Sequence, residues 1–284
     1  MGCCKIQVRI LNMALATFVI GVLLTFPSIS AATIRISSID WIGEDTFATG
    51  LDYSGTEVGG LSGIDYDPLS GRYYAISDDR NNARFYSLEI DLSDGTLDDG
   101  DTSFTGVTTM RDTSGSPFTP NSVDPEAIRF DSTSSTLYWS SEGDANASPA
   151  LETFVREMNL DGTFVRELTN DNVPPDKYAP TADASSGIRD SLAFESIALS
   201  PDGGRVITAT ENALYQDGTV ASLADSSPSR ILSYDKATGI PASEYIYEVD
   251  PIPGAEVKFI PQGEGTRIDV SGTKEIRLNV VYVE

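Results

Sequence analysis

The stretch Leu61–Asp78, LSGIDYDPLSGRYYAISD, recurs twice in this 284-residue chain without a gap. The later copies are PEAIRFDSTSSTLYWSSE at Pro125–Glu142 and FESIALSPDGGRVITATE at Phe194–Glu211. In each copy an alternating apolar run leads into a turn rich in Asp, Pro, Ser or Gly, and a second apolar run follows. This pattern predicts an antiparallel hairpin. A hairpin that recurs at a nearly constant interval is typical of the inner strands of propeller blades.

The three copies agree in register. Ile64, Ile128 and Ile197 occupy the same place, and apolar residues follow each of them two and nine positions later. No sustained helical stripe with caps is convincing anywhere, because the best candidate, Pro149–Met158, reads equally well as loop plus strand. Outer strands are expected at Arg84–Leu92, Phe154–Asn159 and Arg230–Tyr234. We therefore predict an all-β fold, a β-propeller built from antiparallel blades.

The predicted propeller is incomplete at its C-terminus. About four blades are visible, counting partial strands at Ile34–Trp41 and the tail, and we find no copy of the repeat in Gly254–Glu284. We expect one domain over residues 33–253, followed by a divergent tail over 254–284. This tail is either a truncated or altered end of the propeller, or a segment that closes the structure in another way. The complete blades should number fewer than six.

Residues 1–32 have the three parts of a secretory signal peptide. Lys5 and Arg9 give a positive start, Met13–Phe26 is apolar, and Ser30–Ala32 offers small residues for cleavage. Both cysteines of the chain lie within this segment, so the mature protein has no thiol chemistry. We expect a secreted, periplasmic or extracellular monomer with no membrane span after signal removal.

Composition excludes several kinds of function. Asp and Glu number 43 against 19 Lys and Arg, a net charge of −24, which repels nucleic acid. The chain has no histidine, so Ser-His-Asp and Cys-His catalysis and imidazole-bound zinc are excluded. Catalysis would need carboxylates, Lys, Arg, Tyr, hydroxyls or a metal held by oxygen.

Acidic residues recur at the ends of the predicted hairpins. Glu126 and Glu195 begin two of them, where the first copy has a serine, and an acid ends all three, namely Asp78, Glu142 and Glu211. Hairpin pairing should place Glu126 near Glu142 and Glu195 near Glu211, within about two residues of register. Like charges that face each other destabilise a sheet, so the alternatives are solvated or backbone-bonded carboxylates and a site for a cation. Blades around one axis would gather these acids at one mouth, and an oxygen-only site favours Ca²⁺.

The sequence resembles the phytase-like family, also described by its esterase-like activity, of exported bacterial proteins. The resemblance spans roughly residues 39–253, and its motifs occur in the family's order. The matching stretches are Gly60–Ile64 with Ser77–Arg80, Asp124–Ile128 with Ser141–Gly143, Gly187–Glu195 with Ser200–Gly203, and Glu211–Leu214. It implies a β-propeller and hydrolysis of phosphoric or carboxylic esters. Two departures are Ser191, where the family commonly has Asn, and the early end of the chain.

A phytase-like calcium centre would assign roles to particular residues. The expected metal ligands are Asp78, Asp79, Glu126, Glu142, Glu195 and Glu211. Glu126 and Glu195 would also serve catalysis, one unliganded carboxylate acting as general base. Arg80, Arg189 and Ser191 are the expected substrate contacts, with Arg189 also in a catalytic role, because a guanidinium matches phosphate geometry. The alternative for both arginines is a structural ion pair.

Three functions are compatible with these residues. The first is a calcium-dependent phosphoric-ester or ester hydrolase acting on a small molecule. The second is a calcium-stabilised propeller that binds a protein or glycan without catalysis. The third is a lactonase-like sugar-acid hydrolase, because that propeller class also gathers carboxylates around an axial metal. Turnover of p-nitrophenyl phosphate, phytate and a sugar lactone, with and without calcium, distinguishes the three.

Overall fold

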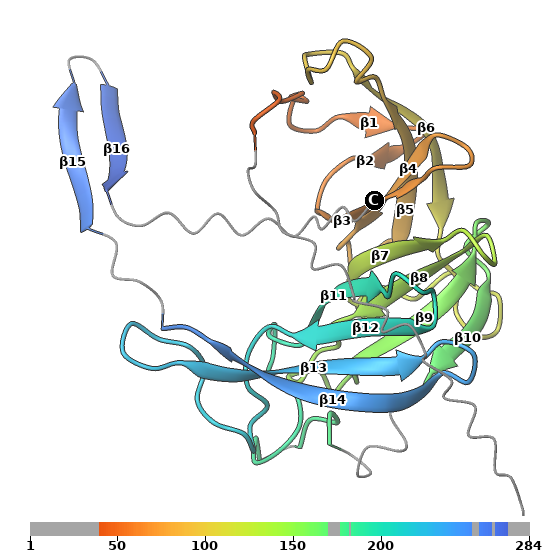
Figure 1. Cartoon of the computed structure of the whole chain (residues 1–284), viewed down its shortest axis with the longest axis vertical. Coiled ribbons are helices and arrows are strands. Elements are labelled where there is room, and N and C mark those ends of the chain that lie inside the picture. The colour runs from red at the N-terminus through yellow and green to blue at the C-terminus, as the bar shows by residue number, and fades with distance from the viewer. Residues whose placement is uncertain (1–39, 170–176, 182, 252–255, 263–264, 272–284) are drawn as a thin grey trace, which may run out of the picture. The chain divides into compact units, whose positions relative to one another are not determined.

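The computed structural model describes residues 40–169, 177–181, 183–251, 256–262 and 265–271. The predicted signal peptide and the strand residues expected before Asp40 lie outside this part of the chain. The described residues form sixteen β-strands and no helix, as predicted for an all-β protein (Figure 1). Accordingly, no described helix is long and apolar enough to cross a bilayer.

Twelve strands form three four-stranded antiparallel sheets, which we call blades 1, 2 and 3. Within each blade the strands pair in chain order, as in a propeller blade. Blade 1 contains β3 (Leu61–Asp67), β4 (Arg72–Ser77), β5 (Arg84–Ile90) and β6 (Thr102–Thr109). Blade 2 contains β7 (Pro125–Asp131), β8 (Thr136–Ser141), β9 (Phe154–Asn159) and β10 (Phe164–Leu168). Blade 3 contains β11 (Phe194–Leu199), β12 (Arg205–Thr210), β13 (Ser227–Asp235) and β14 (Ile240–Val249).

Two short hairpins complete the described strands. They are β1 (Asp52–Tyr53) with β2 (Thr56–Glu57), and β15 (Glu256–Gln262) with β16 (Gly265–Ser271). The second hairpin lies in the stretch where the sequence showed no copy of the repeat. The described residues thus contain three four-stranded sheets, one fewer than the roughly four blades expected from the sequence.

Strand pairing confirms the repeat. Ile64 pairs with Ala75, Ile128 with Trp139 and Ile197 with Thr208, so each isoleucine has its partner eleven positions later. The predicted outer strands appear as β5, β9 and β13. The stretch considered as a helix becomes a loop and then strand β9. The fourth strands β6, β10 and β14 were not predicted.

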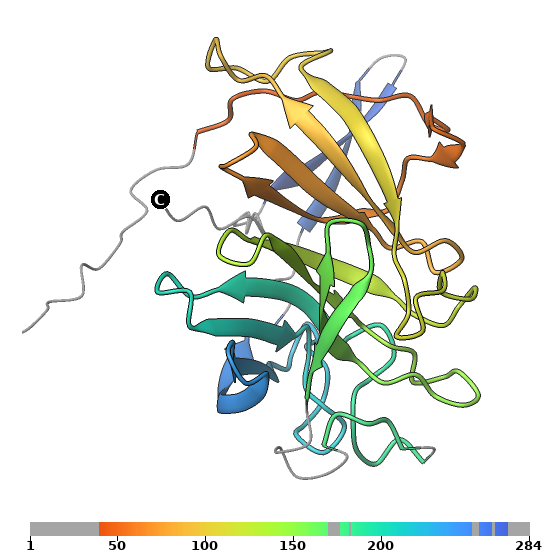
Figure 2. The ribbon, with the colours of Figure 1, turned by 90° about the vertical axis from the view of Figure 1, so that its right-hand side faces the viewer.

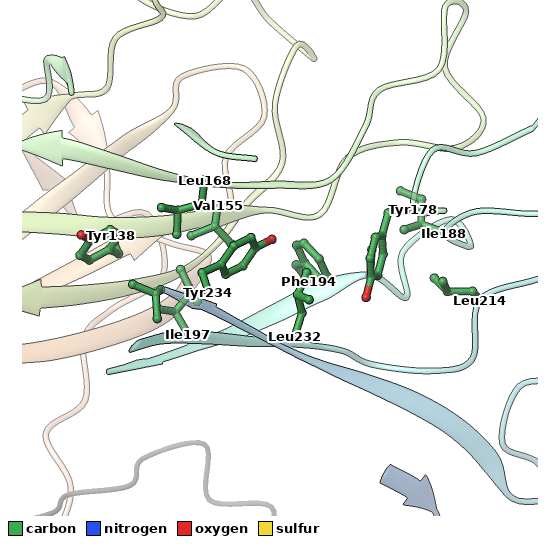
Figure 3. Close-up of a cluster of buried hydrophobic side chains, with 13 residues drawn as sticks. Tyr138, Val155, Leu168, Tyr178, Ile188, Phe194, Ile197, Leu214, Leu232 and Tyr234 are labelled. Atoms are coloured by element: carbon green, nitrogen blue, oxygen red, sulfur yellow. The ribbon is translucent and has the colours of Figure 1, made fainter. Parts of the chain in front are cut away.

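Apolar side chains between neighbouring blades form the core, and the first strands β3, β7 and β11 contact one another in sequence order (Figure 2). Between blades 1 and 2, Tyr74 packs against Phe130, with ring centroids 5.7 Å apart. Between blades 2 and 3, Tyr138 and Val155 pack with Phe194 and other apolar residues of blade 3 (Figure 3). The blades therefore hold one another through the alternate residues of the repeat, which fixes the relative positions of their strand ends.

Candidate metal centre

The first strand of each blade contains one irregularity of pairing at the same place. The register shifts between Leu61 and Gly63 in β3, between Pro125 and Ile128 in β7, and between Phe194 and Ser196 in β11. Ser62, Glu126 and Glu195 lie in these bulges. A bulge leaves its extra residue unpaired and redirects its side chain. Two candidate catalytic carboxylates thus sit on a backbone feature that all three blades share.

The acidic residue after each second strand extends its hairpin by one hydrogen bond. The amides of Asp78, Glu142 and Glu211 donate to the carbonyls of Gly60, Asp124 and Ala193 over 2.7, 2.8 and 2.9 Å. This shared bond places the three acids at the same end of their hairpins. Because of the bulges, Glu142 is opposite Asp124 on the backbone and not opposite Glu126.

Five carboxylates converge in two clusters. One contains Asp124, Glu126 and Glu142, the other contains Glu142, Glu195 and Glu211, and the oxygens of each cluster lie within 4.8 Å of one another. Glu142 belongs to both clusters and is only 4% exposed. Its Oε1 accepts a hydrogen bond of 2.9 Å from the Ala193 amide of blade 3. The structure thus brings together all four glutamates singled out from the sequence and adds Asp124.

Burial raises the pKa values of the clustered carboxyls. Loss of hydration is the largest cause, and it raises the pKa of Asp124 to about 6, of Glu126 to about 8 and of Glu195 to about 9. Repulsion from neighbouring carboxylates adds to each rise, and a hydrogen bond to Glu142 favours protonated Glu195. Burial also raises the pKa of Asp78, whose charge acts on Asp124 and Glu126. Without a cation, the clusters therefore hold protons at neutral pH.

Arg80 lies at the edge of the first cluster. Its guanidinium forms ion pairs with Asp124, at 3.6 Å, and with Asp144, and the charge of Asp190 also acts on it. The hydrogen bond from Arg80 is the main cause that lowers the pKa of Asp144. The Arg80 Nε is buried with no hydrogen-bond partner among the described residues. Arg80 is thus both an ion-paired residue and one with an unused donor beside the carboxylates.

Asp79 and Ser191 differ from their expected placement. The Asp79 carboxylate accepts hydrogen bonds from Arg84 Nη1 at 2.6 Å and from the Asn81 amide at 2.9 Å, and it belongs to neither cluster. Ser191 is exposed and has a left-handed backbone, with φ of 53°. Asp79 therefore orients the Arg84 side chain, and Ser191 forms part of the turn before β11.

Arg189 also has other partners. Its Nε donates to the Ala213 carbonyl at 2.9 Å, its Nη2 donates to the Gly218 carbonyl at 2.6 Å, and its guanidinium lies 4.2 Å from the ring centre of Tyr215. These contacts hold the loop that follows β12. The alternative expected for Arg189 from the sequence was a structural ion pair, but these hydrogen-bond partners are neutral backbone carbonyls.

Three residues of the site were missed in the sequence. Asp124 precedes the β7 strand, and Asp144 and Asp190 accompany Arg80. The repeat could not identify Asp124, because Gly60 and Ala193 occupy the same position in the other copies. Asp190 stands in a motif that matched the family, and its place beside Ser191 was the available signal.

The donor chemistry of the clusters fits a hard divalent cation. All donors are carboxylate oxygens, which suit Ca²⁺. In the described part of the chain, no Lys or Arg forms an ion pair with Glu126, Glu142 or Glu195. Their repulsion is thus relieved by protons or by a cation.

Gly60 offers a local test of the Asp78 position. It has φ of 58°, and an added Cβ would lie 1.7 Å from Asp78 Oδ1. We expect Gly60→Ala to displace Asp78 and thereby to reduce the calcium-dependent gain in melting temperature. The left-handed backbone of an alanine at this position should also lower the free energy of unfolding by about 1–2 kcal/mol. Gly71→Ala is the matched control, because Gly71 has φ of 74° in the same hairpin and open space around it. Equal calcium responses of the two variants would show that Asp78 does not contribute to the site.

Comparison with known proteins places the chain in a family. No curated protein sequence matches it. Solved structures that it resembles include hydrazine synthase of Kuenenia stuttgartiensis, with 11% identity, a TM-score of 0.35, and 66% of this chain and 37% of that chain covered. A putative 6-phosphogluconolactonase of Bacteroides fragilis has 10% identity and a TM-score of 0.35, with 80% of this chain and 60% of that chain covered. The periplasmic gluconolactonase of Pseudomonas aeruginosa has 10% identity and a TM-score of 0.35, with 71% and 61% covered.

The chain thus spans less than two thirds of the length of these three structures. The chain also matches a protein-family model. The family model described as "Phytase-like: Esterase-like activity of phytase" matches residues 56–273, which include both carboxylate clusters and the hairpin β15–β16. Since this match covers more than half of the sequence, the chain belongs to the phytase-like family.

Proposed function

We propose that this protein is an exported, calcium-dependent hydrolase of small phosphoric or carboxylic esters. The observation that carries the proposal is the meeting of five acidic side chains from blades 2 and 3 in two clusters that share Glu142. The description of the family, which names phytase and an esterase-like activity, supports the same reaction class. The proposed monomer acts after removal of residues 1–32 and has no nucleic-acid partner.

Two sets of residues would hold calcium. Asp124, Glu126 and Glu142 form one set, and Glu142, Glu195 and Glu211 form the other. Asp78 stands beside the first set and adds negative charge there. Bound calcium supplies positive charge that attracts the substrate anion and stabilises charge on the reacting oxygens. Glu142, fixed by its hydrogen bond to Ala193, keeps the two sets in register with each other.

Glu126 and Glu195 are the proposed proton-transfer residues. Both lie on bulges, and without a cation burial raises both pKa values well above that of an ordinary glutamate. The one of the two that calcium leaves unliganded exchanges a proton near neutral pH. An ionised carboxylate at these positions accepts a proton from the attacking water, and the protonated form returns it to the leaving-group oxygen. Their partial exposure gives water access to the carboxyls.

Arg80 is the proposed contact for the substrate anion. Its buried Nε has an unused hydrogen-bond donor, which a phosphate or carboxylate oxygen could accept. Its ion pairs with Asp124 and Asp144 fix the guanidinium beside the first cluster. We leave Arg189 and Asp79 out of the proposed site, because backbone carbonyls bind the first and Arg84 binds the second.

Hydrolysis assays test the proposal. We expect the purified protein to hydrolyse p-nitrophenyl phosphate, phytate or p-nitrophenyl acetate in calcium, and a chelator to lower the rate by about 100-fold or more. Restored activity on adding calcium back is the control for damage by the chelator. Turnover of a sugar lactone alone would favour the lactonase-like function. A calcium-dependent rise in melting temperature with no turnover of any substrate would favour a binding propeller.

A further inference from the structure

Blade 3 has a face that is apolar but poorly covered. Pairing across the sheet places Ala209, Ile231 and Tyr245 in one row, with Ala198 and Ile207 in the next. We call these five residues the open face of blade 3. Ala198 is exposed, Ala209, Ile207 and Ile231 are half-buried, and Tyr245 is 60% exposed. An apolar face of this kind is expected to have a partner.

The equivalent faces of the other blades are covered. In blade 2 the corresponding row is Ser140, Val155 and Leu168, which are 0%, 0% and 1% exposed. In blade 1 the equivalent pair is Ile76 with Phe85, at 0% and 1%. Each of these faces is buried by the first strands of the following blade. The open face of blade 3 is therefore the surface on which the repeat would place a fourth blade.

The hairpin β15–β16 has the position along the chain that a fourth blade requires. The first strands of blades 1, 2 and 3 begin at Leu61, Pro125 and Phe194, and β15 begins at Glu256. The intervals are 64, 69 and 62 residues. The family match also continues through this hairpin to residue 273.

The register of the hairpin agrees with this assignment. Counted from the turn, the second and fourth pairs of blade 2 are Phe130 with Leu137 and Ile128 with Trp139, and these four residues pack toward blade 1. In β15–β16 the fourth pair is Phe259 with Ile268, and the sixth is Val257 with Val270. Alternate pairs share one face of a hairpin. The two apolar pairs of β15–β16 therefore lie on the same face as the pairs of blade 2 that pack against the preceding blade.

We propose that β15–β16 is the first hairpin of a fourth blade, and that the face carrying Val257, Phe259, Ile268 and Val270 docks on the open face of blade 3. A two-stranded hairpin alone is at best marginally stable in water. Docking supplies the apolar contact that would keep it folded, and it covers a surface that would otherwise favour association. The occupant of the open face is therefore a segment of the same chain.

Hydrogen exchange measured by mass spectrometry on the whole chain tests the proposal. We expect the amides of residues 256–271 to exchange at least tenfold more slowly in the wild type than in an Ile207→Asp variant. Ala198→Glu is the second variant, since Ala198 is exposed and its change should leave blade 3 folded. Leu223→Asp is the matched control, because Leu223 is 73% exposed and lies outside the open face. Unchanged exchange in β7 and β8 verifies that each variant remains folded.

Two results would overturn the proposal. One is exchange of residues 256–271 at the rate of an unfolded peptide in the wild type. The other is equal protection of this segment in the wild type, Ala198→Glu and Leu223→Asp proteins. If protection instead increases with protein concentration, together with a dimeric mass in light scattering, a second copy of the chain covers the open face and the assignment to β15–β16 is wrong.

Discussion

Replacing Glu142 with Gln is expected to lower calcium-dependent hydrolysis by about 100-fold or more, the largest effect of any single substitution in the site. Glu142 is the residue that both clusters share, so one substitution removes a charged ligand from each of them. Gln retains an oxygen that can accept the Ala193 amide, so the bond between blades 2 and 3 is preserved. Steady-state kinetics over a calcium titration measure the loss.

Thermal unfolding gives a second measurement of the same change. Calcium at a hundredfold excess over its Kd should stabilise the wild type by about 2.7 kcal/mol, and a hundredfold weaker site would leave about 0.4 kcal/mol. Glu152→Gln is the control, because it removes the same charge from an exposed position of the chain. A Glu142→Gln protein that keeps both its activity and its calcium response would contradict the assignment of the centre.

Stability without calcium is expected to fall as the pH rises from 5 to 8. The pKa values of Glu126 and Glu195 are raised to about 8 and about 9 in the folded protein, from an ordinary value of 4.5. In this window the folded state holds protons that the unfolded state has lost, so rising pH favours unfolding. One such group contributes at most about 1.4 kcal/mol per pH unit, and we expect about half of this, because solvent reaches both carboxyls.

Denaturant unfolding in chelator at a series of pH values measures this dependence. Over three pH units the two glutamates together should cost about 4 kcal/mol. Calcium should abolish the decline, because the cation replaces the protons and its stabilising effect grows with pH. Glu195→Gln should reduce the slope, since one of the two titrating groups is removed. A flat or rising stability curve in chelator would mean that these carboxyls are ionised in the folded protein without a cation.

The repeat was visible in the sequence because its apolar residues have a constant register. Ile64, Ile128 and Ile197 and their partners across the hairpins could therefore be placed before the structure was known. The fourth strands could not, since they lie at the outer edge, where alternation is weaker and the burial of β14 is mostly partial or absent. The hairpin β15–β16 escaped detection because only two residues separate its paired strand ends, Gln262 and Gly265, whereas four residues separate the first two strands of blades 1 and 2.

The carboxylate site could be predicted only in outline, because the repeat reveals only those acidic residues that recur at equivalent positions. Recurrence identified the acids at equivalent positions, but Asp124 has no acidic counterpart in the other two copies. Two charged residues also have partners that their neighbours in the sequence did not predict. Asp79 follows Asp78 directly yet binds Arg84, and Arg189 stands in a family motif yet holds backbone carbonyls. The partner that a charged side chain contacts depends on the direction in which the side chain points, and this direction can differ between adjacent residues. The apolar periodicity of the sequence says little about this direction.

At the three bulges, the pairing of the strands does not depend on which side chain is present. Ser62, Glu126 and Glu195 stand outside the regular ladder, and the strand on either side keeps its pairing whether the position holds a hydroxyl or a carboxyl group. Such a position can acquire, lose or exchange a functional group through one codon change, with little effect on folding. Successive blades descended from one ancestral hairpin could therefore diverge in chemistry while they kept a common architecture, and a designer could place a charge on the bulge of blade 1 through residue 62 alone.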